Sequence, residues 1–414
     1  MIGLVDGNNF YVSCERIFDL SLAGKPVAVL SNNDGCVISR SNEFKALKIP
    51  MGTPYFQLRN RKDLIMRSSN YELYGDISRR IIQVLAEFVP EVEQYSIDEA
   101  FIHPELPDSA DFRTFGENIR SAVLQWVGVP CGVGFAPSKT LAKIANHIGK
   151  KQPSGVFVMP SDPMPVLEKL PLSEVWGVGH RLAPKLEAAG IRNAWELAEA
   201  DPVYIQRKFN VITARTVLEL RGQPVIERED PEELSQSITC SRSFGHPVVD
   251  FGDLREAVAS YTARAAEKLR REKQCAAGVN IYFQYYPEYE PVSLSGGFTG
   301  TTVMFEVPVS DTSAMLSAIT PKLPGIFIEG RRYKKAGVIF FGLEPEAVQG
   351  DLFRDAARQE KSRQLSAALD RINHQYGRGT LRHLSEGLAQ PWKMNRSLQT
   401  PRYTTSWDDL PIVK

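Results

Sequence analysis

The strongest constraint on the fold is the order of the apolar patterns along the first 151 residues. Short β-branched runs alternate with segments whose apolar residues recur every three or four positions, as expected for strands and amphipathic helices. Their order is strand–helix–strand–strand–helix–strand, which is the split βαββαβ unit. The expected strands cover 2–6, a pair around 94–103, and 131–136; the expected helices cover 76–89 (stopped by Pro90), 112–127 and 138–151.

The same topology predicts where three carboxylates meet. The first strand of a split βαββαβ unit lies beside the central hairpin, so Asp6 should face Asp98 and Glu99 of "YSIDEAF". Crowded carboxylates are costly unless they are paired, hydrogen-bonded or bound to a metal. Mg²⁺ prefers carboxylates with substrate phosphates, and two ions about 3.5–4 Å apart can activate a hydroxyl and stabilise a leaving pyrophosphate. The alternative is solvated, idle acids at an exposed turn.

The rest of the chain adds further segments. A strand at 25–32 and a short basic helix at 39–48 interrupt the first unit, and short helices with one glycine hairpin occupy about 166–230. A charged stretch that contains proline, 227–237, is typical of a linker. A second βαββαβ pattern follows, and then a polar helix. The strands of this second unit are expected at 237–245, 278–286, 301–307 and 336–343, and its helices at 253–273 and 311–319. The polar helix is expected at 354–374.

Composition limits the classes of function. The 49 basic and 49 acidic residues give a formal net charge of +0, so any site for a polyanion must come from local clustering. Five scattered cysteines without a CxxC pair suit a reducing cytosol and indicate no zinc site. The start, "MIGLVDGNNFY", is not that of a signal peptide, and no apolar run is long enough to cross a membrane.

Two aromatic residues follow the first acid closely. Phe10 and Tyr11 come four and five positions after Asp6, where a helix should begin after the first strand. A bulky pair there could lie under a nucleotide sugar, and Tyr11 would then exclude a 2′-hydroxyl while a deoxyribose passes. An ordinary pair of core aromatics is the alternative.

Basic residues near this site could meet a triphosphate. Arg40 and Lys45 lie in the expected short helix, and Lys150 and Lys151 lie in "IGKKQPSG". Lysine is a usual partner of phosphate. Solvated surface lysines are the alternative for each of them.

Two further motifs suggest contacts with larger partners. Gly177 and Gly179 of "GVGHRLAPKLEAAGI" form a glycine hairpin before a helix, which exposes backbone N–H groups suited to one DNA phosphate; a tight helical turn is the alternative. "QGDLF", with Gln349, Leu352 and Phe353, has the character of a short docking peptide with two apolar anchors. It could equally be the first turn of the next helix.

Together these motifs resemble the Y family of translesion DNA polymerases, and most closely its UmuC-type branch, the catalytic subunit of DNA polymerase V. "DGNNFYVSCE", "YSIDEAF", "GVGFAPSKTLAKIAN" and the glycine hairpin occur in the family's order within residues 1–345. The resemblance implies an α+β right-hand polymerase fold with two βαββαβ domains. Its parts would be a palm (1–20 and 76–165), small fingers (21–75), a helix-hairpin-helix thumb (166–230), a linker (231–237), a little finger (238–345) and a clamp-binding and partner-binding tail (346–414).

The resemblance also implies roles for residues of the palm. Asp6, Asp98 and Glu99 match the ligands of two Mg²⁺ ions, with the Gly7 carbonyl as an extra ligand. Tyr11 matches the steric gate against ribonucleotides, and Phe10 lies beside it at the sugar. Lys150 matches the lysine that holds the triphosphate.

Two departures from the family concern the fingers and the tail. Asn42 and Lys45 align with a tyrosine and an arginine of many members, so they would contact the nucleotide differently. Gln349, Leu352 and Phe353 resemble the family's sliding-clamp peptide, in which Gly350 replaces a common leucine and would weaken docking.

The implied activity is error-prone primer extension past damaged template bases in the SOS response to DNA damage. The primer 3′-hydroxyl would attack the α-phosphate of a templated dNTP. The implied partners are primer–template DNA, dNTP, the sliding clamp, a UmuD′-type dimer and a RecA filament, in the bacterial cytoplasm at the nucleoid. Two rivals are a nucleotidyl cyclase, disfavoured by the glycine hairpin and the second βαββαβ domain, and a non-catalytic DNA-binding scaffold, disfavoured by the three acids.

Overall fold

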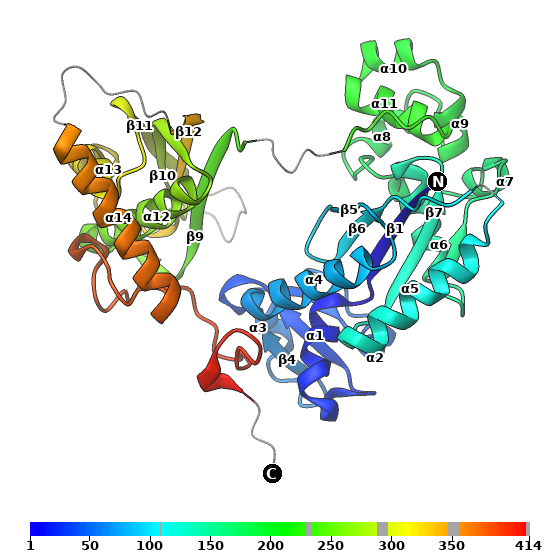
Figure 1. Cartoon of the computed structure of the whole chain (residues 1–414), viewed down its shortest axis with the longest axis horizontal. Coiled ribbons are helices and arrows are strands. Elements are labelled where there is room, and N and C mark those ends of the chain that lie inside the picture. Colours follow the sequence, from blue (N-terminus) through cyan, green and yellow to red (C-terminus); the bar gives the residue numbers. More distant parts are fainter. Residues whose placement is uncertain (108, 229–233, 288–296, 347–355, 411–414) are drawn as a thin grey trace. The chain divides into compact units, whose positions relative to one another are not determined.

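The computed structural model describes residues 1–107, 109–228, 234–287, 297–346 and 356–410, and they form two compact units (Figure 1). Unit 1 comprises Met1–Pro231 and Ser397–Lys414, and unit 2 comprises Glu232–Arg396. The C-terminal segment therefore returns to unit 1 after the chain has formed unit 2. Among the described residues, no helix is long and apolar enough to cross a membrane.

A five-stranded sheet forms the centre of unit 1. Its order is β5-β6-β1-β7-β8, and β1 runs antiparallel to both of its neighbours. The predicted position of the first strand beside the central hairpin is confirmed. The parallel edge strand β8 was not predicted, because three residues are too few to show a pattern. The strands are β1 (Ile2–Gly7), β5 (Val92–Gln94), β6 (Glu99–Ile102), β7 (Cys131–Ala136) and β8 (Val156–Val158).

Helices cover both faces of this sheet because successive residues of each strand point to opposite sides. Val5 of β1 joins a core with α4 (Tyr71–Ala86) and α5 (Phe112–Val127). Leu4 joins a second core with α6 (Lys139–Gly149). The predicted helices 112–127 and 138–151 are confirmed within two residues at each end.

The boundaries predicted for α4 were wrong at both ends. The helix begins at Tyr71 rather than 76, because the Asn70 side chain accepts a hydrogen bond from the Leu73 N–H and caps it. It ends at Ala86, before Pro90. The apolar pattern revealed only the middle of this helix.

Helix α6 lies against the sheet at a glycine. A Cβ atom on Gly134 would lie 2.1 Å from the backbone nitrogen of Asn146, so no other residue fits there without displacing the helix. The buried Asn146 amide donates to the carbonyls of Leu4 and Gly132 at 3.2 and 2.8 Å. These contacts fix α6 over β1 and β7.

A small sheet of order β3-β2-β4 is inserted between α1 and α4. The predicted helix 39–48 was wrong at its start, because Ser39 and Arg40 are the last residues of β3. The Ser41 hydroxyl accepts from the Phe44 N–H and begins α2 one residue later. The elements are α1 (Phe10–Phe18), β2 (Val27–Leu30), β3 (Val37–Arg40), α2 (Asn42–Ala46), α3 (Tyr55–Leu58) and β4 (Ile65–Ser68).

Short helices after β8 complete unit 1 and share the second core with α6. Gly177, in the turn between the first and second of them, has a φ of +83°, a left-handed conformation that favours glycine. The predicted glycine turn among short helices is confirmed. The helices are α7 (Met164–Leu167), α8 (Ala183–Glu187), α9 (Ala194–Glu199), α10 (Pro202–Lys208) and α11 (Val211–Leu220).

Unit 2 has the predicted βαββαβ order, but its sheet order is β11-β10-β12-β9. The first and third strands of this unit in chain order, β9 and β11, lie at the edges of its sheet. In the central sheet of unit 1, by contrast, the second strand, β5, lies at an edge. The polar helix predicted at 354–374 is α14. The elements are β9 (Ser237–Val248), α12 (Phe251–Arg271), β10 (Gln274–Tyr285), β11 (Gly297–Val309), α13 (Thr312–Ile319), β12 (Tyr333–Pro345) and α14 (Ala356–Tyr376).

Candidate active site

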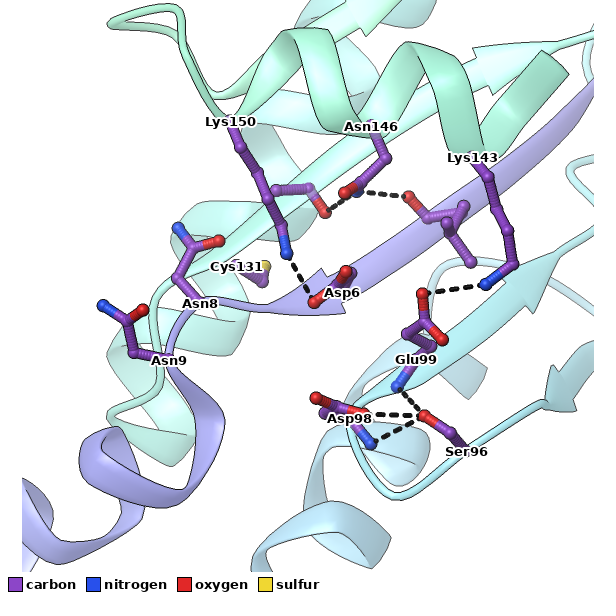
Figure 2. A network of polar contacts seen from close by, with 12 residues as sticks. Asp6, Asn8, Asn9, Ser96, Asp98, Glu99, Cys131, Lys143, Asn146 and Lys150 are labelled. Carbon is purple, nitrogen blue, oxygen red and sulfur yellow. Dashed lines mark hydrogen bonds and ion pairs between the residues drawn. The ribbon is translucent and has the colours of Figure 1, made fainter. Parts of the chain in front are cut away.

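The register of β1 and β6 brings the predicted acids together. Asp6 lies directly opposite Glu99 in the antiparallel ladder, and Asp98 precedes Glu99 in the turn from β5 (Figure 2). The Gly7 N–H donates to the Asp98 carbonyl at 2.8 Å, which ties the end of β1 to this turn. The expected meeting of the three acids is therefore present in the backbone.

Each acid nevertheless has its own partner. Lys150 Nζ lies 2.5 Å from Asp6 Oδ1, and Lys143 Nζ lies 2.9 Å from Glu99 Oε1. The Ser96 hydroxyl donates to Asp98 Oδ1 at 2.7 Å. The acids are half-buried, so they are not the fully solvated acids of the alternative; their catalytic role stays a prediction.

Burial disfavours the ionised form of the Asp6 carboxyl. Burial raises its pKa from 3.8 to about 6, and the nearby charges of Glu99 and Asp98 add to this, although Lys150 opposes it. The site therefore holds a carboxylate whose charge is only partly compensated. A further cation would lower its pKa.

The donors suit a divalent cation in type and backbone position. They are hard carboxylate oxygens at adjacent positions of one ladder. Among the described residues, however, no group of three His, Cys, Asp or Glu side chains is arranged to hold a metal ion. Each acid is turned toward its lysine or toward Ser96, so these side chains must rotate to share an ion. The Gly7 carbonyl stays a prediction.

Two lysines of α6 that the sequence-based predictions did not include, Lys139 and Lys143, supply further cations beside the predicted Lys150. Lys139, Lys143 and Lys150 follow one another at spacings of four and seven along the helix and its end. They pair with Glu93, Glu99 and Asp6 respectively. The spacing of Lys139 and Lys143 in "SKTLAKIAN", on a predicted helix, was the available signal.

Lys143 also lies among aromatic rings. Its Nζ is 4.3 Å from the Tyr95 ring centre and 5.0 Å from that of Trp176. Lys143, Lys150, Asp6, Glu99 and Trp176 line an open cleft of about 340 Å³. A cleft of this size, with acids and lysines at its wall, can accommodate a small polyanion and its counter-ions.

Phe10 and Tyr11 differ in environment. Phe10 is 3% exposed and belongs to the core, which is the alternative stated for the pair. Tyr11 is half-buried, stacks on Tyr74 with ring centres 4.8 Å apart, and meets the Tyr71 ring edge-on at 5.8 Å. Burial raises the pKa of Tyr11 to about 12, so its phenol stays neutral. Its steric-gate role stays a prediction.

Three of the predicted basic residues lie close to one another. Partial burial lowers the pKa of Lys45, and the charges of Arg40 and Lys150 lower it further. Arg40 is held by donating to the Ile49 carbonyl at 2.6 Å. Asn42 accepts a hydrogen bond from the Asn9 amide at 3.0 Å, which joins α2 to the loop after β1. Their contacts with nucleotide stay predictions.

Two predicted contacts concern larger partners. The contact of Gly177 and Gly179 with a DNA phosphate stays a prediction. Gln349, Leu352 and Phe353 fall within 347–355, outside the described residues.

Comparison with known proteins places the chain in a family. Residues 5–147 match the impB/mucB/samB family and residues 235–352 match its C-terminal domain. The chain is 42% identical to Protein UmuC of Salmonella typhimurium over the full length of both proteins. The chain belongs to the impB/mucB/samB family. Another relative, Protein SamB of Salmonella typhimurium, is 41% identical over the full length of both.

More distant relatives of this family member are polymerases. DNA polymerase IV 1 of Bacillus subtilis is 31% identical and covers 68% of the chain and 69% of the relative. A solved structure, the Y-family DNA polymerase chimera Dbh-Dpo4(243-245)-Dbh, matches with a TM-score of 0.63 and 19% identity over 83% of this chain and all of that one. This likeness confirms the predicted Y-family polymerase fold.

Two further matches fall on segments already described. Residues 160–191, which include the turn of Gly177 and Gly179, match the IMS family HHH motif. Residues 363–413 match a domain of unknown function. That second match covers most of α14 and the segment that returns to unit 1.

Proposed function

We propose that this chain is a template-directed, error-prone DNA polymerase that extends primers past damaged template bases in the bacterial DNA-damage response. Membership of a family that includes UmuC, together with the Y-family fold, supports this function. The observation that carries the proposal is the register of Asp6 opposite Glu99, beside Asp98, in a cleft that also holds lysines.

The acids would form the metal site. Asp6, Asp98 and Glu99, with the Gly7 carbonyl, would hold two Mg²⁺ ions, which supply activation of the primer 3′-hydroxyl and stabilisation of the leaving pyrophosphate. Their carboxylates would exchange Lys150, Lys143 and Ser96 for these ions. The raised pKa of Asp6 favours the exchange, because its charge is under-compensated in the described arrangement.

The basic residues would bind the nucleotide. Lys150, once released from Asp6, would pair with the triphosphate of the dNTP, joined by Lys45 of α2. Asn42 would position α2 against the loop of Asn9. Tyr11 would exclude the ribose 2′-hydroxyl, and the buried Phe10 would support the wall on which the sugar rests.

The remaining partners follow from the family and the motifs. Backbone N–H groups of the turn at Gly177 and Gly179 would contact a phosphate of the primer–template DNA. Gln349, Leu352 and Phe353 would bind the sliding clamp. As a relative of UmuC, the chain would work with a UmuD′-type dimer and a RecA filament, in the cytoplasm at the nucleoid.

Primer extension across an abasic site tests the function. The full-length chain with Mg²⁺ should extend the primer, and Asp98→Ala with Glu99→Ala should lower the rate by at least about 100-fold, because the charge of the transition state loses its stabilisation. Glu87→Ala with Glu105→Ala, two exposed acids of unit 1, is the matched control and should extend normally. Undiminished extension by the site variant would contradict the assignment.

A further inference from the structure

The C-terminal segment that returns to unit 1 is an integral part of it. We call Ser397–Thr405 the strap; it lies within the match to a domain of unknown function. Its backbone and side chains contact buried polar groups of unit 1, rather than lying on the surface through apolar contacts alone. The contacts fall in two places, at the edge of the small sheet and at the start of α4.

The first attachment is at β4, an edge strand of the small sheet. Ser68 and Leu398 exchange two hydrogen bonds: the Ser68 N–H donates to the Leu398 carbonyl, and the Leu398 N–H donates to the Ser68 hydroxyl, both at 3.0 Å. The buried carboxylate of Asp34 accepts from the Ser397 N–H and hydroxyl at 3.2 and 3.1 Å. The strap thus pairs with the last residue of this edge strand.

The second attachment joins the strap to α4 and α1. The fully buried Asn70, which caps α4, donates to the Thr400 and Pro401 carbonyls at 3.0 and 3.2 Å. The Tyr403 ring stacks on Phe18, the last residue of α1, with centres 4.7 Å apart. The strap therefore holds the two helices that carry Tyr74 and Tyr11.

One buried carboxylate connects the strap to the site. Glu15 of α1 is 2% exposed, and its Oε1 accepts from the Thr400 hydroxyl at 3.2 Å and from the Tyr74 hydroxyl at 2.6 Å. Tyr74 in turn stacks on Tyr11 with an interplanar angle of 18°. A buried carboxylate needs its donors, so losing one of them changes how it holds the other.

We propose that the strap positions Tyr11, the proposed steric gate. The hydrogen bond from Thr400 to Glu15 fixes the Tyr74 hydroxyl, and the stacked Tyr74 ring fixes Tyr11. Exclusion of ribonucleotides then depends on a residue more than 380 positions away in the sequence. This inference rests on the proposed role of Tyr11 as the steric gate. Thr400 is a positioning residue, since it acts through Glu15 and Tyr74.

The test measures sugar discrimination, the ratio of kcat/KM for a dNTP to that for the matching rNTP, with the full-length chain. Thr400→Val removes the hydroxyl at nearly constant volume, and should lower this ratio roughly three- to tenfold by raising rNTP use. Thr400→Ser keeps a hydroxyl and should restore the ratio. Thr404→Val is the matched control, because among the described residues the buried Thr404 hydroxyl has no hydrogen-bond partner.

Combination with Tyr11→Ala separates the strap from the gate. Tyr11→Ala should abolish discrimination, and Thr400→Val should have no further effect in that background. If Tyr11→Ala removes discrimination while Thr400→Val leaves it unchanged, the strap proposal fails and the gate stands. If Tyr11→Ala leaves discrimination unchanged, the gate itself fails, and the strap proposal with it. A Thr400→Ser variant that behaves as Thr400→Val would show a packing effect and also overturn the proposal.

Discussion

Replacing Asp6 by asparagine should stabilise the metal-free protein at neutral pH. Burial raises the pKa of Asp6 to about 6 from 3.8, so the folded state binds this proton more tightly than the unfolded state. The contribution to the free energy of unfolding is therefore fully present below about pH 4 and is lost as the pH rises through about 6. The difference corresponds to about 3 kcal/mol, an upper value since Lys150 loses its partner in the variant.

Urea unfolding in the presence of a chelator, followed by tryptophan fluorescence from pH 4 to 8, measures this effect. Four of the five tryptophans (Trp126, Trp176, Trp195 and Trp407) lie in unit 1, so the signal reports mainly on the unit that holds Asp6. The advantage of Asp6→Asn should be near zero at pH 4 and should approach its maximum above about pH 7, because asparagine stays neutral throughout. Added Mg²⁺ should shrink it by binding the wild-type carboxylates.

The control is a second Asp→Asn change in unit 1 with the opposite pKa shift. Hydrogen bonds from Thr114 hold the pKa of Asp111, at the start of α5, below its usual value, so its charge favours folding above that value. Asp111→Asn should therefore bring no gain at neutral pH. If Asp6→Asn is no more stable than the wild type at pH 8, or if its gain is the same at every pH, the account of Asp6 is refuted.

Two other predictions concern packing and docking. Gly134→Ala should destabilise unit 1 by about 3 kcal/mol or more in the same urea assay, because its Cβ would lie 2.1 Å from the Asn146 backbone nitrogen. The control is Gly179→Ala, which has open space around it and should change the free energy of unfolding by less than about 0.5 kcal/mol. Equal effects of the two changes would contradict this view of α6 packing. Leu352→Ala with Phe353→Ala should reduce the stimulation of primer extension by the sliding clamp; an equal loss with and without the clamp would indicate a structural role instead.

The order of the apolar patterns was enough to predict that Asp6 meets the acids of the hairpin, because that order determines which strands are neighbours. The split βαββαβ order places the first strand beside the hairpin, and Asp6 does lie opposite Glu99. The sheet order of unit 2 did not follow from the same pattern, because one element order allows more than one pairing of strands. Periodicity also missed the start of α4, which depends on the side chain of Asn70.

The positions of the acids could be predicted from local patterns, but their pairing partners could not. Lys143 meets Glu99 because Gly134 lets α6 approach the sheet, which is a tertiary effect. The return of the strap to unit 1 could not be predicted from local patterns either. Contacts such as Thr400 with Glu15 join segments with no shared periodicity, so no local pattern reports them.

The lysines of α6 explain how the acids are tolerated. Glu93, Glu99 and Asp6 lie on the neighbouring strands β5, β6 and β1, and each meets one lysine of the helix. The lysine side chains are 3%, 15% and 28% exposed in that order, from Lys139 to Lys150. Breaking the most buried pair would leave an uncompensated charge inside the protein, so Lys139 and Glu93 hold the structure together.

Lys150 and Asp6, at the other end of this row, border the open cleft and can part at lower cost because water and ions reach them. We infer that the three lysine–acid pairs combine one fixed pair, which stabilises the fold, with exchangeable pairs that serve function. The repulsion among the acids is thus offset by lysines in the arrangement described, and in the proposed reaction it would be offset by Mg²⁺ when Lys150 turns to the triphosphate.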